Sequence, residues 1–522
     1  MSDPAGPPDG LATGLGADIG ATPDPGKAPE IGLEPGLGAR AARGAAITLG
    51  AQGGRMIVQV ASVVVLARLL TPHDYGLIAM VVAIIGVGEL LRDFGLSSAA
   101  IQAPELSVPQ RDNLFWINSG IGVGLAVIVY FGAGILELVY QQAELISIAH
   151  ALCLTFLING LATQYRADLV RRLKFTRLAL ADILAPTLAL IFAIAAGLLG
   201  WGYWALVVQQ LTQASVLLIV VAVSAGWLPR LPRRHTNLGP LLRFGSNLMA
   251  TQLVGYISNN VDSVVIGVRF GAVSLGFYSR AFQLLMTPLN QVRIPLTTVA
   301  LPVLSRIGGD IRRFGGYIVQ GQLVLGYTLV AGLALAVGAA EPITEIFLGH
   351  RWVSVAPLLA LLAAAGIFQT LAFVGYWVYV SRALTSQLLR YTLLSSAIKV
   401  VCIVAGSYWG VVGVAAGYAL APALSWPISF WWLSRHTELP LRRLYAGAGR
   451  ILALVVIASG AAGAVALWLR GGGAWLQLGG AIVAVGVVYA LAAAILPPIR
   501  RDASVVLRII RMIPGRRSRG AV

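Results

Sequence analysis

The chain has 522 residues, of which 57% are hydrophobic and only 11% are charged. Because a soluble globular protein carries about 25% charged residues, this composition excludes a soluble protein and predicts one that crosses a membrane many times. The net charge of +17 could suggest a nucleic-acid partner, but the basic residues cluster in short loops between apolar runs. Such clustering reports the orientation of a membrane protein, so no nucleic acid is expected as a partner.

The two ends of the chain differ from its apolar middle. Residues 1–43 are rich in Gly, Pro and Ala and lack the basic start and apolar core of a secretory signal. We expect them to form a disordered cytoplasmic tail. In residues 499–522, aliphatic residues alternate with Arg508 and Arg511, and three further arginines follow. This pattern predicts a basic amphipathic tail that lies on the anionic cytoplasmic leaflet.

Between these tails, fourteen apolar runs are each long enough to cross a bilayer as a helix, which takes about 20 residues. They cover residues 44–70, 75–97, 112–138, 145–166, 178–199, 203–226, 243–268, 275–304, 316–340, 356–381, 390–408, 411–434, 450–469 and 475–497. We therefore expect an all-α membrane protein with about 14 transmembrane helices. If both termini are cytoplasmic, 30 of the 38 Lys and Arg residues fall inside, 5 outside and 3 within the membrane. If one span were missing or extra, the basic loops that follow it would lie outside, so the excess of inside Lys and Arg supports the number of spans.

One segment of the chain is repeated 200 residues later. Residues 51–76 align without gaps on residues 251–276, and each ends in a short outside turn, at 70–76 and at 270–276. The offset predicts two six-helix lobes in the same orientation, at 44–232 and 233–434, with 435–498 adding two C-terminal helices. Parallel repeats of this kind enclose a central site and permit alternating access.

Three cations, Arg55, Arg293 and Lys399, fall near the middle of predicted spans. A charge at that depth costs at least ~2.5–3.5 kcal/mol, so it normally faces a protein interior or a watery cavity and marks a transport path. For any one of these cations, the competing interpretation is that the side chain reaches the membrane surface (snorkelling) or pairs with a nearby acid. This interpretation explains all three together less well. Together they predict a polar pocket for an anionic substrate.

Acidic residues are candidates for coupling transport to a cation gradient. Glu89, Arg92 and Asp93 cluster toward the inside end of span 2, where positions 89 and 93 share a helix face. A structural Glu89–Arg92 pair explains this cluster; alternatively, Glu89 or Asp93 takes up H⁺ or Na⁺. Asp262 in span 7 is a second candidate. The sequence has no phosphate-binding loop for ATP, and its two cysteines lie inside apolar runs, so neither a metal site nor another cofactor is expected.

Four segments carry a resemblance to a known group of transporters: 66–76 (LARLLTPHDYG), 93–101 (DFGLSSAAI), 112–116 (DNLFW) and 275–281 (LGFYSRA). They resemble the multidrug/oligosaccharidyl-lipid/polysaccharide exporter superfamily and, within it, the bacterial polysaccharide flippases of the Wzx type. The similarity covers about residues 44–434 and extends toward 497. No single motif is diagnostic, but the combination with twelve plus two spans is specific.

The resemblance implies transport of an undecaprenyl-diphosphate-linked oligosaccharide to the periplasmic leaflet of the bacterial inner membrane, for exopolysaccharide or lipopolysaccharide O-antigen biosynthesis. Members of the group use a V-shaped cavity lined chiefly by spans 1, 2, 7 and 8, whose basic residues face the pyrophosphate. Arg55 and Arg293 match those spans, and Lys399 in span 11 is a third candidate. Polar residues expected to meet the sugar are Gln52, Gln59, Asn118, Gln252, Asn259, Asn290 and Gln291. Hydrogen bonding between helices is the alternative role for each of them.

Two other functions fit parts of the sequence. A membrane-embedded polysaccharide polymerase would be expected to carry a sizeable outside loop, but the longest one here, 341–355, is short. A multidrug or cation exporter of the same superfamily would use acids and aromatic residues rather than central cations. We therefore expect a monomeric multi-pass transporter and not an enzyme. Its expected partners are the lipid-linked oligosaccharide, the bilayer, a polysaccharide polymerase and export machinery.

Overall fold

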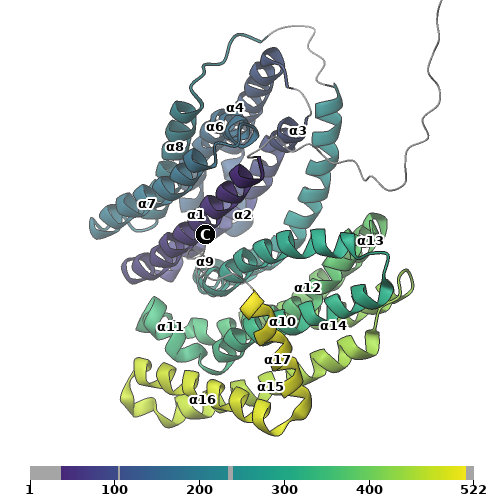
Figure 1. Cartoon of the computed structure of the whole chain (residues 1–522). Coiled ribbons are helices and arrows are strands. Elements are labelled where there is room, and N and C mark those ends of the chain that lie inside the picture. The colour runs from purple at the N-terminus through teal and green to yellow at the C-terminus, as the bar shows by residue number, and fades with distance from the viewer. Residues whose placement is uncertain (1–36, 104–105, 233–238, 513–522) are drawn as a thin grey trace, which may run out of the picture. The chain divides into compact units, whose positions relative to one another are not determined.

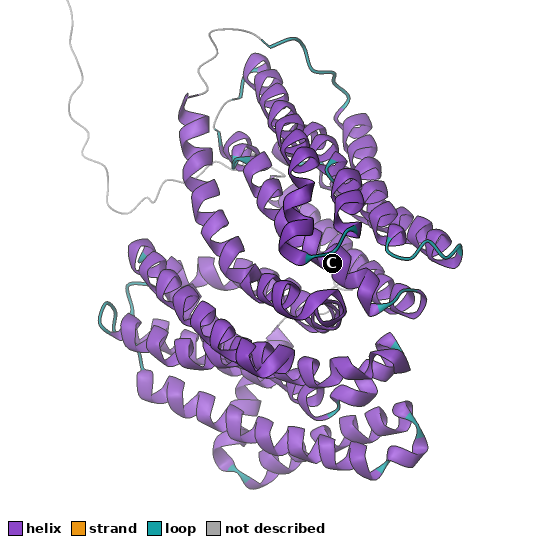
Figure 2. Cartoon of the chain, turned by 180° about the vertical axis from the view of Figure 1, so that it is seen from behind, coloured by secondary structure: helices purple, strands orange, loops and turns teal. Residues whose placement is uncertain are grey.

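The computed structural model describes residues 37–103, 106–232 and 239–512, and within these ranges all regular structure is helical (Figures 1 and 2). Residues 1–46 and 47–522 are two structural units, and the described part of the first is the start of the first helix. The α-helices are α1 (Leu37–Leu69), α2 (Pro72–Asp93), α3 (Leu96–Gln102), α4 (Val108–Tyr140), α5 (Glu144–Leu152), α6 (Leu154–Arg171), α7 (Phe175–Leu198), α8 (Trp204–Ala225), α9 (Gly239–Arg306), α10 (Ile311–Gly338), α11 (Ala340–Leu348), α12 (Ala356–Ser381), α13 (Thr385–Gly406), α14 (Gly410–Ser434), α15 (Leu441–Trp468), α16 (Ala474–Ile495) and α17 (Pro497–Met512). Short 3-10 helices are η1 (His350–Val355), η2 (Ser407–Trp409) and η3 (Arg470–Gly472).

The predicted membrane spans all correspond to helices. In the described residues, twelve segments are long and apolar enough to cross a membrane. Two of these segments, Gly255–Arg306 and Thr385–Ser434, are 52 and 50 residues long and each hold two predicted spans. The fold class expected from the sequence, an all-α membrane protein with about 14 transmembrane helices, is thereby confirmed.

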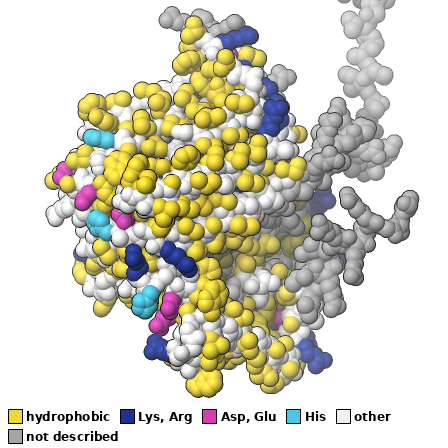
Figure 3. Space-filling model, turned by 90° about the vertical axis from the view of Figure 1, so that its left-hand side faces the viewer, with side chains coloured by type: hydrophobic (Ala, Val, Ile, Leu, Met, Phe, Trp, Pro, Cys, Tyr) yellow, Lys and Arg dark blue, Asp and Glu magenta, His cyan; other side chains and the backbone are white. Residues whose placement is uncertain are grey.

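Large apolar side chains lie on the outer surface, as contact with lipid requires. Hydrophobic side chains dominate the face shown in Figure 3, and the charged side chains there are few. Phe131 of α4 is 81% exposed and Val223 of α8 is 77% exposed. Exposed apolar surface on this scale is foreign to a soluble monomer and supports a position in the membrane.

Local sequence signals fix several helix ends. Thr71 caps α2: its side chain accepts from the Asp74 amide, Asp74 accepts from the Thr71 amide at 2.8 Å, and Pro72 occupies the first turn. Such a capping box satisfies amide groups that would otherwise lack partners. Asp310 likewise caps α10 by accepting from two backbone amides. These caps set the depth at which each helix enters the bundle.

Spans 7 and 8 are two helices that meet at a kink, with no loop between them. Helix α9 runs from Gly239 to Arg306, and its only non-helical residue is Gly271, with φ 75° and ψ −176°. Only glycine adopts this conformation without strain, so the predicted turn at 270–276 is reduced to a sharp kink at one residue.

The two repeated turns contact each other reciprocally. A β-carbon on Gly76 would lie 1.7 Å from the carbonyl oxygen of Ala272, and one on Gly276 would lie 1.8 Å from that of Pro72. Because 72 and 76 correspond to 272 and 276 in the predicted repeat, the contact has approximate two-fold symmetry. Glycine is required at both positions, since any side chain would push the two backbones apart.

The predicted boundaries need some correction. Helix α1 begins at Leu37, so residues 37–43 are helical, whereas the sequence predicted disorder; residues 1–36 lie outside the described residues. The predicted division between lobes at 232/233 falls next to residues 233–238, which are also outside them. At the other end, Asp502 anchors α17, because it pairs with Arg450 at 2.7 Å and accepts from Tyr327 at 3.2 Å. Residues 513–522 of the predicted amphipathic tail are not described.

Candidate functional site

Two neighbouring cavities contain the three predicted intramembrane cations. The first, here called the arginine cavity, has a volume of about 440 Å³ and is lined mainly by α1, α2, α8 and α9. The second, here called the aromatic cavity, has a volume of about 650 Å³ and is lined by α9, α12, α13 and α14. Phe282 of α9 lines both. The three cations are thus divided: Arg55 lines the arginine cavity, whereas Arg293 and Lys399 line the aromatic cavity.

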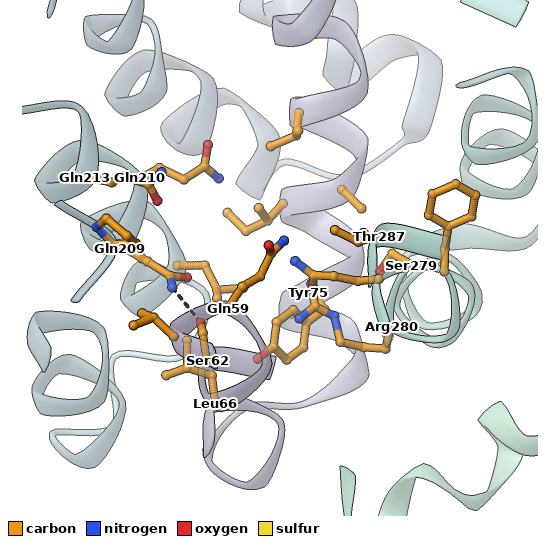
Figure 4. A pocket seen from close by; sticks show the side chains of 18 of the residues that line it. Gln59, Ser62, Leu66, Tyr75, Gln209, Gln210, Gln213, Ser279, Arg280 and Thr287 are labelled. Carbon is orange, nitrogen blue, oxygen red and sulfur yellow. Dashed lines mark hydrogen bonds between the residues drawn. The ribbon is translucent and has the colours of Figure 1, made fainter. Parts of the chain in front are cut away.

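The arginine cavity is lined by a second arginine, Arg280 of α9, in addition to Arg55 of α1. The Arg280 guanidinium stacks on the Tyr75 ring, 3.8 Å from its centroid (Figure 4). Its Nε atom is buried without a hydrogen-bond partner. Among the described residues, neither Arg55 nor Arg280 forms an ion pair or a hydrogen bond. Two guanidinium groups without an ion pair or hydrogen bond among the described residues therefore line one cavity. Arg55 also lines the smaller cavity that Arg166 and Asp182 line.

The remaining polar groups of the arginine cavity are neutral. They are amides and hydroxyls: Gln59, Ser62, Gln209, Gln210, Gln213, Ser279, Gln283 and Thr287. None of the described side chains that line the cavity is acidic. Gln209 donates to the Ser62 hydroxyl at 2.7 Å, which joins α8 to α1 (Figure 4). A concave site with cations and no acids concentrates anions.

Arg293 is committed to neutral partners on one neighbouring helix. It is 7% exposed and donates to Thr370 Oγ1 at 3.0 Å, Gln369 Oε1 at 3.3 Å and the Gly366 carbonyl at 3.4 Å, all on α12. Its guanidinium also lies 5.4 Å from the centroid of Phe373. These contacts use most of the donors of Arg293 to hold α9 against α12.

Lys399 and Asp262 form a second charged group beside the aromatic cavity. Lys399 Nζ donates to Asn259 Oδ1 at 3.1 Å and lies 4.6 Å from the centroid of the Tyr418 ring. Asp262 is 1% exposed and accepts a hydrogen bond of 2.5 Å from the Tyr278 hydroxyl, while its other oxygen has no partner. The two charges interact electrostatically but are not in direct contact. Asp262 does not line the cavity, and none of the described side chains that do is acidic, so Lys399 faces the cavity without a carboxylate beside it there.

Four of the predicted sugar-contacting residues lie in or between the two cavities. Gln59 lines the arginine cavity, and Asn259 and Asn290 line the aromatic cavity. Gln291 of α9 donates to the Gln59 side chain of α1 at 2.8 Å. This hydrogen bond joins the first predicted span directly to the eighth.

The other three lie elsewhere. Gln52 lines a smaller cavity next to the ion pair between Arg166 and Asp182. Asn118 was predicted to face the transport path, but it is buried where α4 packs against α6 and lines neither cavity. Gln252 is exposed and also lines neither. Span membership alone could not distinguish these positions, because it does not specify the helix face.

The acidic cluster in α2 has structural partners. Glu89 pairs with Arg92 at 2.8 Å and accepts from Asn159 at 2.9 Å. Asp93 accepts from Ser97 at 2.9 Å. The structural Glu89–Arg92 pair that the spacing suggested is therefore present. No cluster of potential metal ligands occurs in the part of the chain that the structure describes.

Arg280 is the site residue that the sequence reasoning missed. The distribution of basic residues predicts that Arg280 lies outside, close to a helix end, with Arg68, Arg269, Arg351 and Arg470. The signal that could have found it was its place inside the apolar run 275–304, one helical turn beyond Gly276. In the structure it is part of α9 and lines the arginine cavity.

Comparison with known proteins places this architecture in a family. Residues 65–357, more than half of the chain, match the family model described as "Polysaccharide biosynthesis protein". The lipopolysaccharide biosynthesis protein WzxC of Escherichia coli is 23% identical over 373 residues, which cover 70% of this chain and 75% of WzxC. The succinoglycan biosynthesis transport protein ExoT of Rhizobium meliloti is 24% identical over 302 residues, covering 58% of this chain and 61% of ExoT.

Solved structures show the same fold at low sequence identity. The lipid II flippase MurJ in an inward closed conformation superposes with a TM-score of 0.65 at 14% identity, covering 86% of this chain and 98% of that one. An inward-facing multidrug resistance transporter of the MATE family, of the MOP superfamily, superposes with a TM-score of 0.60 at 15% identity, covering 78% and 98%. The chain thus belongs to the polysaccharide biosynthesis protein family, as a multi-pass membrane protein, and has the same helical fold as these two solved structures.

Proposed function

We propose that the protein moves an undecaprenyl-diphosphate-linked oligosaccharide repeat unit from the cytoplasmic to the periplasmic leaflet of the bacterial inner membrane. The observation that carries this proposal is the pair Arg55 and Arg280: within the described residues, neither forms an ion pair or a hydrogen bond, and no acidic side chain lines their cavity. The names of the relatives, a lipopolysaccharide biosynthesis protein and a succinoglycan transport protein, support polysaccharide precursors as the substrate class. The resulting polymer would be an exopolysaccharide or a lipopolysaccharide O-antigen.

The chemistry of the arginine cavity suits a diphosphate. Each guanidinium presents paired N–H donors that match two phosphate oxygens, and it stays charged at any physiological pH. Two of them on different helices, Arg55 on α1 and Arg280 on α9, can each take one phosphate of the pair. The surrounding glutamine amides can donate to the remaining oxygens. A cationic drug would gain nothing from such a site, which argues against the multidrug exporter.

Contacts between the two halves of the chain, at the end that bears the two turns, support alternating access in this proposal. Trp352 of η1 is fully buried and donates to the Ala67 carbonyl of α1 at 2.8 Å. Arg68 donates to the Ile346 carbonyl at 3.0 Å, again between the two halves of the chain. Together with the reciprocal Gly76 and Gly276 contacts, these bonds hold the two halves against each other at that end, which we take as the closed end of the path. In the orientation that the basic residues favour, with both termini cytoplasmic, this closed end is periplasmic.

Energy coupling in this proposal uses Asp262. Among the described residues, it is the buried carboxylate with one oxygen that lacks a hydrogen-bond partner, and it interacts electrostatically with Lys399. Uptake of H⁺ or Na⁺ at this oxygen would change the charge that Lys399 experiences. The driving force for uphill transport would then come from the cation gradient.

The direct test is reconstitution in proteoliposomes with a fluorescent lipid-linked sugar, using dithionite quenching to follow its leaflet. We expect the native protein to move the diphosphate-linked lipid and to move the matched monophosphate-linked lipid more slowly. Arg280→Gln should abolish the movement and Arg280→Lys should retain part of it. Arg351→Gln, at an exposed arginine of η1, is the matched control and should have no effect. Equal movement of both lipids, or full activity of Arg280→Gln, would reject the proposal.

A further inference from the structure

The aromatic cavity is larger than the arginine cavity, and binding of a diphosphate leaves it unused. Its walls combine aromatic rings, including Phe373, Tyr376, Tyr418 and Trp426, with serine, threonine and asparagine side chains. A sugar ring has apolar C–H faces and a polar rim of hydroxyls, so it is served by rings that pack on its faces and by hydroxyls and amides at its edge. A volume of about 650 Å³ lies in the range of ordinary small-ligand sites.

The two cavities adjoin in a way that suits a sugar attached to a diphosphate. Phe282 of α9 forms part of both walls. On the same helix, Thr287 lines the arginine cavity and Asn290, one turn further, lines the aromatic cavity. A group bound between Arg55 and Arg280 would therefore place its first sugar next to the aromatic cavity.

One cation of the aromatic cavity is available to a ligand, and the other is not. Arg293 is held by three groups of α12 and by Asn290. Lys399, by contrast, has a single neutral hydrogen-bond partner, the Asn259 amide oxygen, and makes no ion pair within the described residues. An ammonium group has three donors, so it retains hydrogen-bonding capacity toward the cavity.

We propose that the aromatic cavity binds the oligosaccharide and that Lys399 pairs there with the carboxylate of an acidic sugar, such as a hexuronate. This inference rests on the proposed function, because it takes the glycan of the same lipid-linked substrate as the occupant. Lys399 is then a specificity-determining residue: it selects repeat units that carry a negative charge on the sugar. The rings of Tyr376 and Tyr418 contribute affinity for acidic and neutral sugars alike.

The test is titration calorimetry on the full-length protein in lipid nanodiscs, with three soluble probes. Two are trisaccharides that differ only in one residue, glucuronate against glucose, and the third is inorganic pyrophosphate. We expect the native protein to bind the glucuronate trisaccharide at least about fivefold more tightly, the difference between a charge-assisted and a neutral hydrogen bond. Lys399→Arg should keep this preference and Lys399→Gln should remove it. Lys174→Gln, at a lysine outside both cavities, is the matched control.

Two further variants separate specificity from misfolding. Lys399→Gln leaves Asp262 as an uncompensated buried charge, so the neutral double variant Lys399→Gln/Asp262→Asn is measured as well. It should bind both trisaccharides with the affinity that the native protein shows for the neutral one. Tyr376→Leu, at a ring that is 42% exposed, should weaken both trisaccharides without changing their ratio.

Equal affinity of the native protein for the two trisaccharides would overturn the inference, as would no binding of either or a preference that survives in the double variant. Pyrophosphate binding, measured on the same preparations and abolished by Arg280→Gln, reports the proposed function separately. If pyrophosphate binds and the acidic sugar is not preferred, the inference fails and the proposed function stands. If the acidic sugar is preferred through Lys399 but pyrophosphate does not bind, the result supports the glycan site and counts against a diphosphate in the arginine cavity.

Discussion

The reciprocal glycine contact makes a sharp prediction about Gly276. In Gly276→Ala, the new methyl carbon would lie 1.8 Å from the Pro72 carbonyl oxygen, well inside van der Waals contact. That oxygen belongs to backbone, so no side chain can rotate away, and the two helices must separate by roughly 1.5 Å. Overpacking of this kind costs about 1–3 kcal/mol.

This cost raises the free energy of only one conformation, the one in which the turns at 70–76 and 270–276 touch. The turns are apart once the periplasmic end opens, so the open conformation is not affected. A change of about 1–3 kcal/mol in a two-state equilibrium lowers the ratio of closed to open molecules about 5- to 150-fold. The predicted result is a protein that exposes its arginine cavity to the periplasmic side for a larger fraction of the time.

The assay uses one reporter cysteine in the arginine cavity, Ser62→Cys, in a chain whose native Cys153 and Cys402 have been replaced. Labelling by a membrane-impermeant maleimide added from the periplasmic side should be faster in Gly276→Ala. Gly120→Ala is the control, because a β-carbon there meets no atom within 4 Å. Unchanged labelling in Gly276→Ala, or the same acceleration in Gly120→Ala, would refute the role of the glycine contact as a seal.

Two further predictions concern contacts that hold the structure together. Trp352→Phe keeps the ring but leaves the buried Ala67 carbonyl without its donor; we expect a loss of about 1–3 kcal/mol of stability and a lower melting temperature, and no change for the exposed control Trp475→Phe. Stability unaffected by Trp352→Phe would mean that the hydrogen bond is replaced or unimportant. Asp502→Asn removes the charge that pairs with Arg450 and should release α17, seen as faster hydrogen exchange over residues 497–512. Native-like protection there would show that apolar contacts alone hold this helix.

The number of spans was predictable because it depends on stretches of about 20 apolar residues, which are a local property of the sequence. The repeat was predictable for a related reason: its two turns occupy equivalent positions at 70–76 and 270–276. The sharp kink at Gly271 was not predictable from the sequence. A glycine occurs in both a turn and a kink, and the two differ only in how the following helix packs.

The positions of the candidate site residues relative to the two cavities were harder to predict, for one reason. Each residue of a helix is turned about 100° from the last, so the span that holds a residue does not tell which neighbour it faces. The span of Asn118 predicts a place in the transport path, yet Asn118 is fully buried and lines neither cavity. Arg55, Arg293 and Lys399 were expected in one pocket, but the structure divides them between two cavities and pairs Arg55 with the overlooked Arg280.

The most direct test of the proposed transport is the location of lipid-linked sugar units in cells that lack the protein, with the membrane side determined by an impermeant probe. We expect these units to accumulate on the cytoplasmic leaflet. Native protein and Arg351→Gln should restore them to the periplasmic leaflet, whereas Arg55→Gln/Arg280→Gln should not. Unpolymerised units on the periplasmic leaflet of the deficient cells would contradict a flipping role and point to the polymerase.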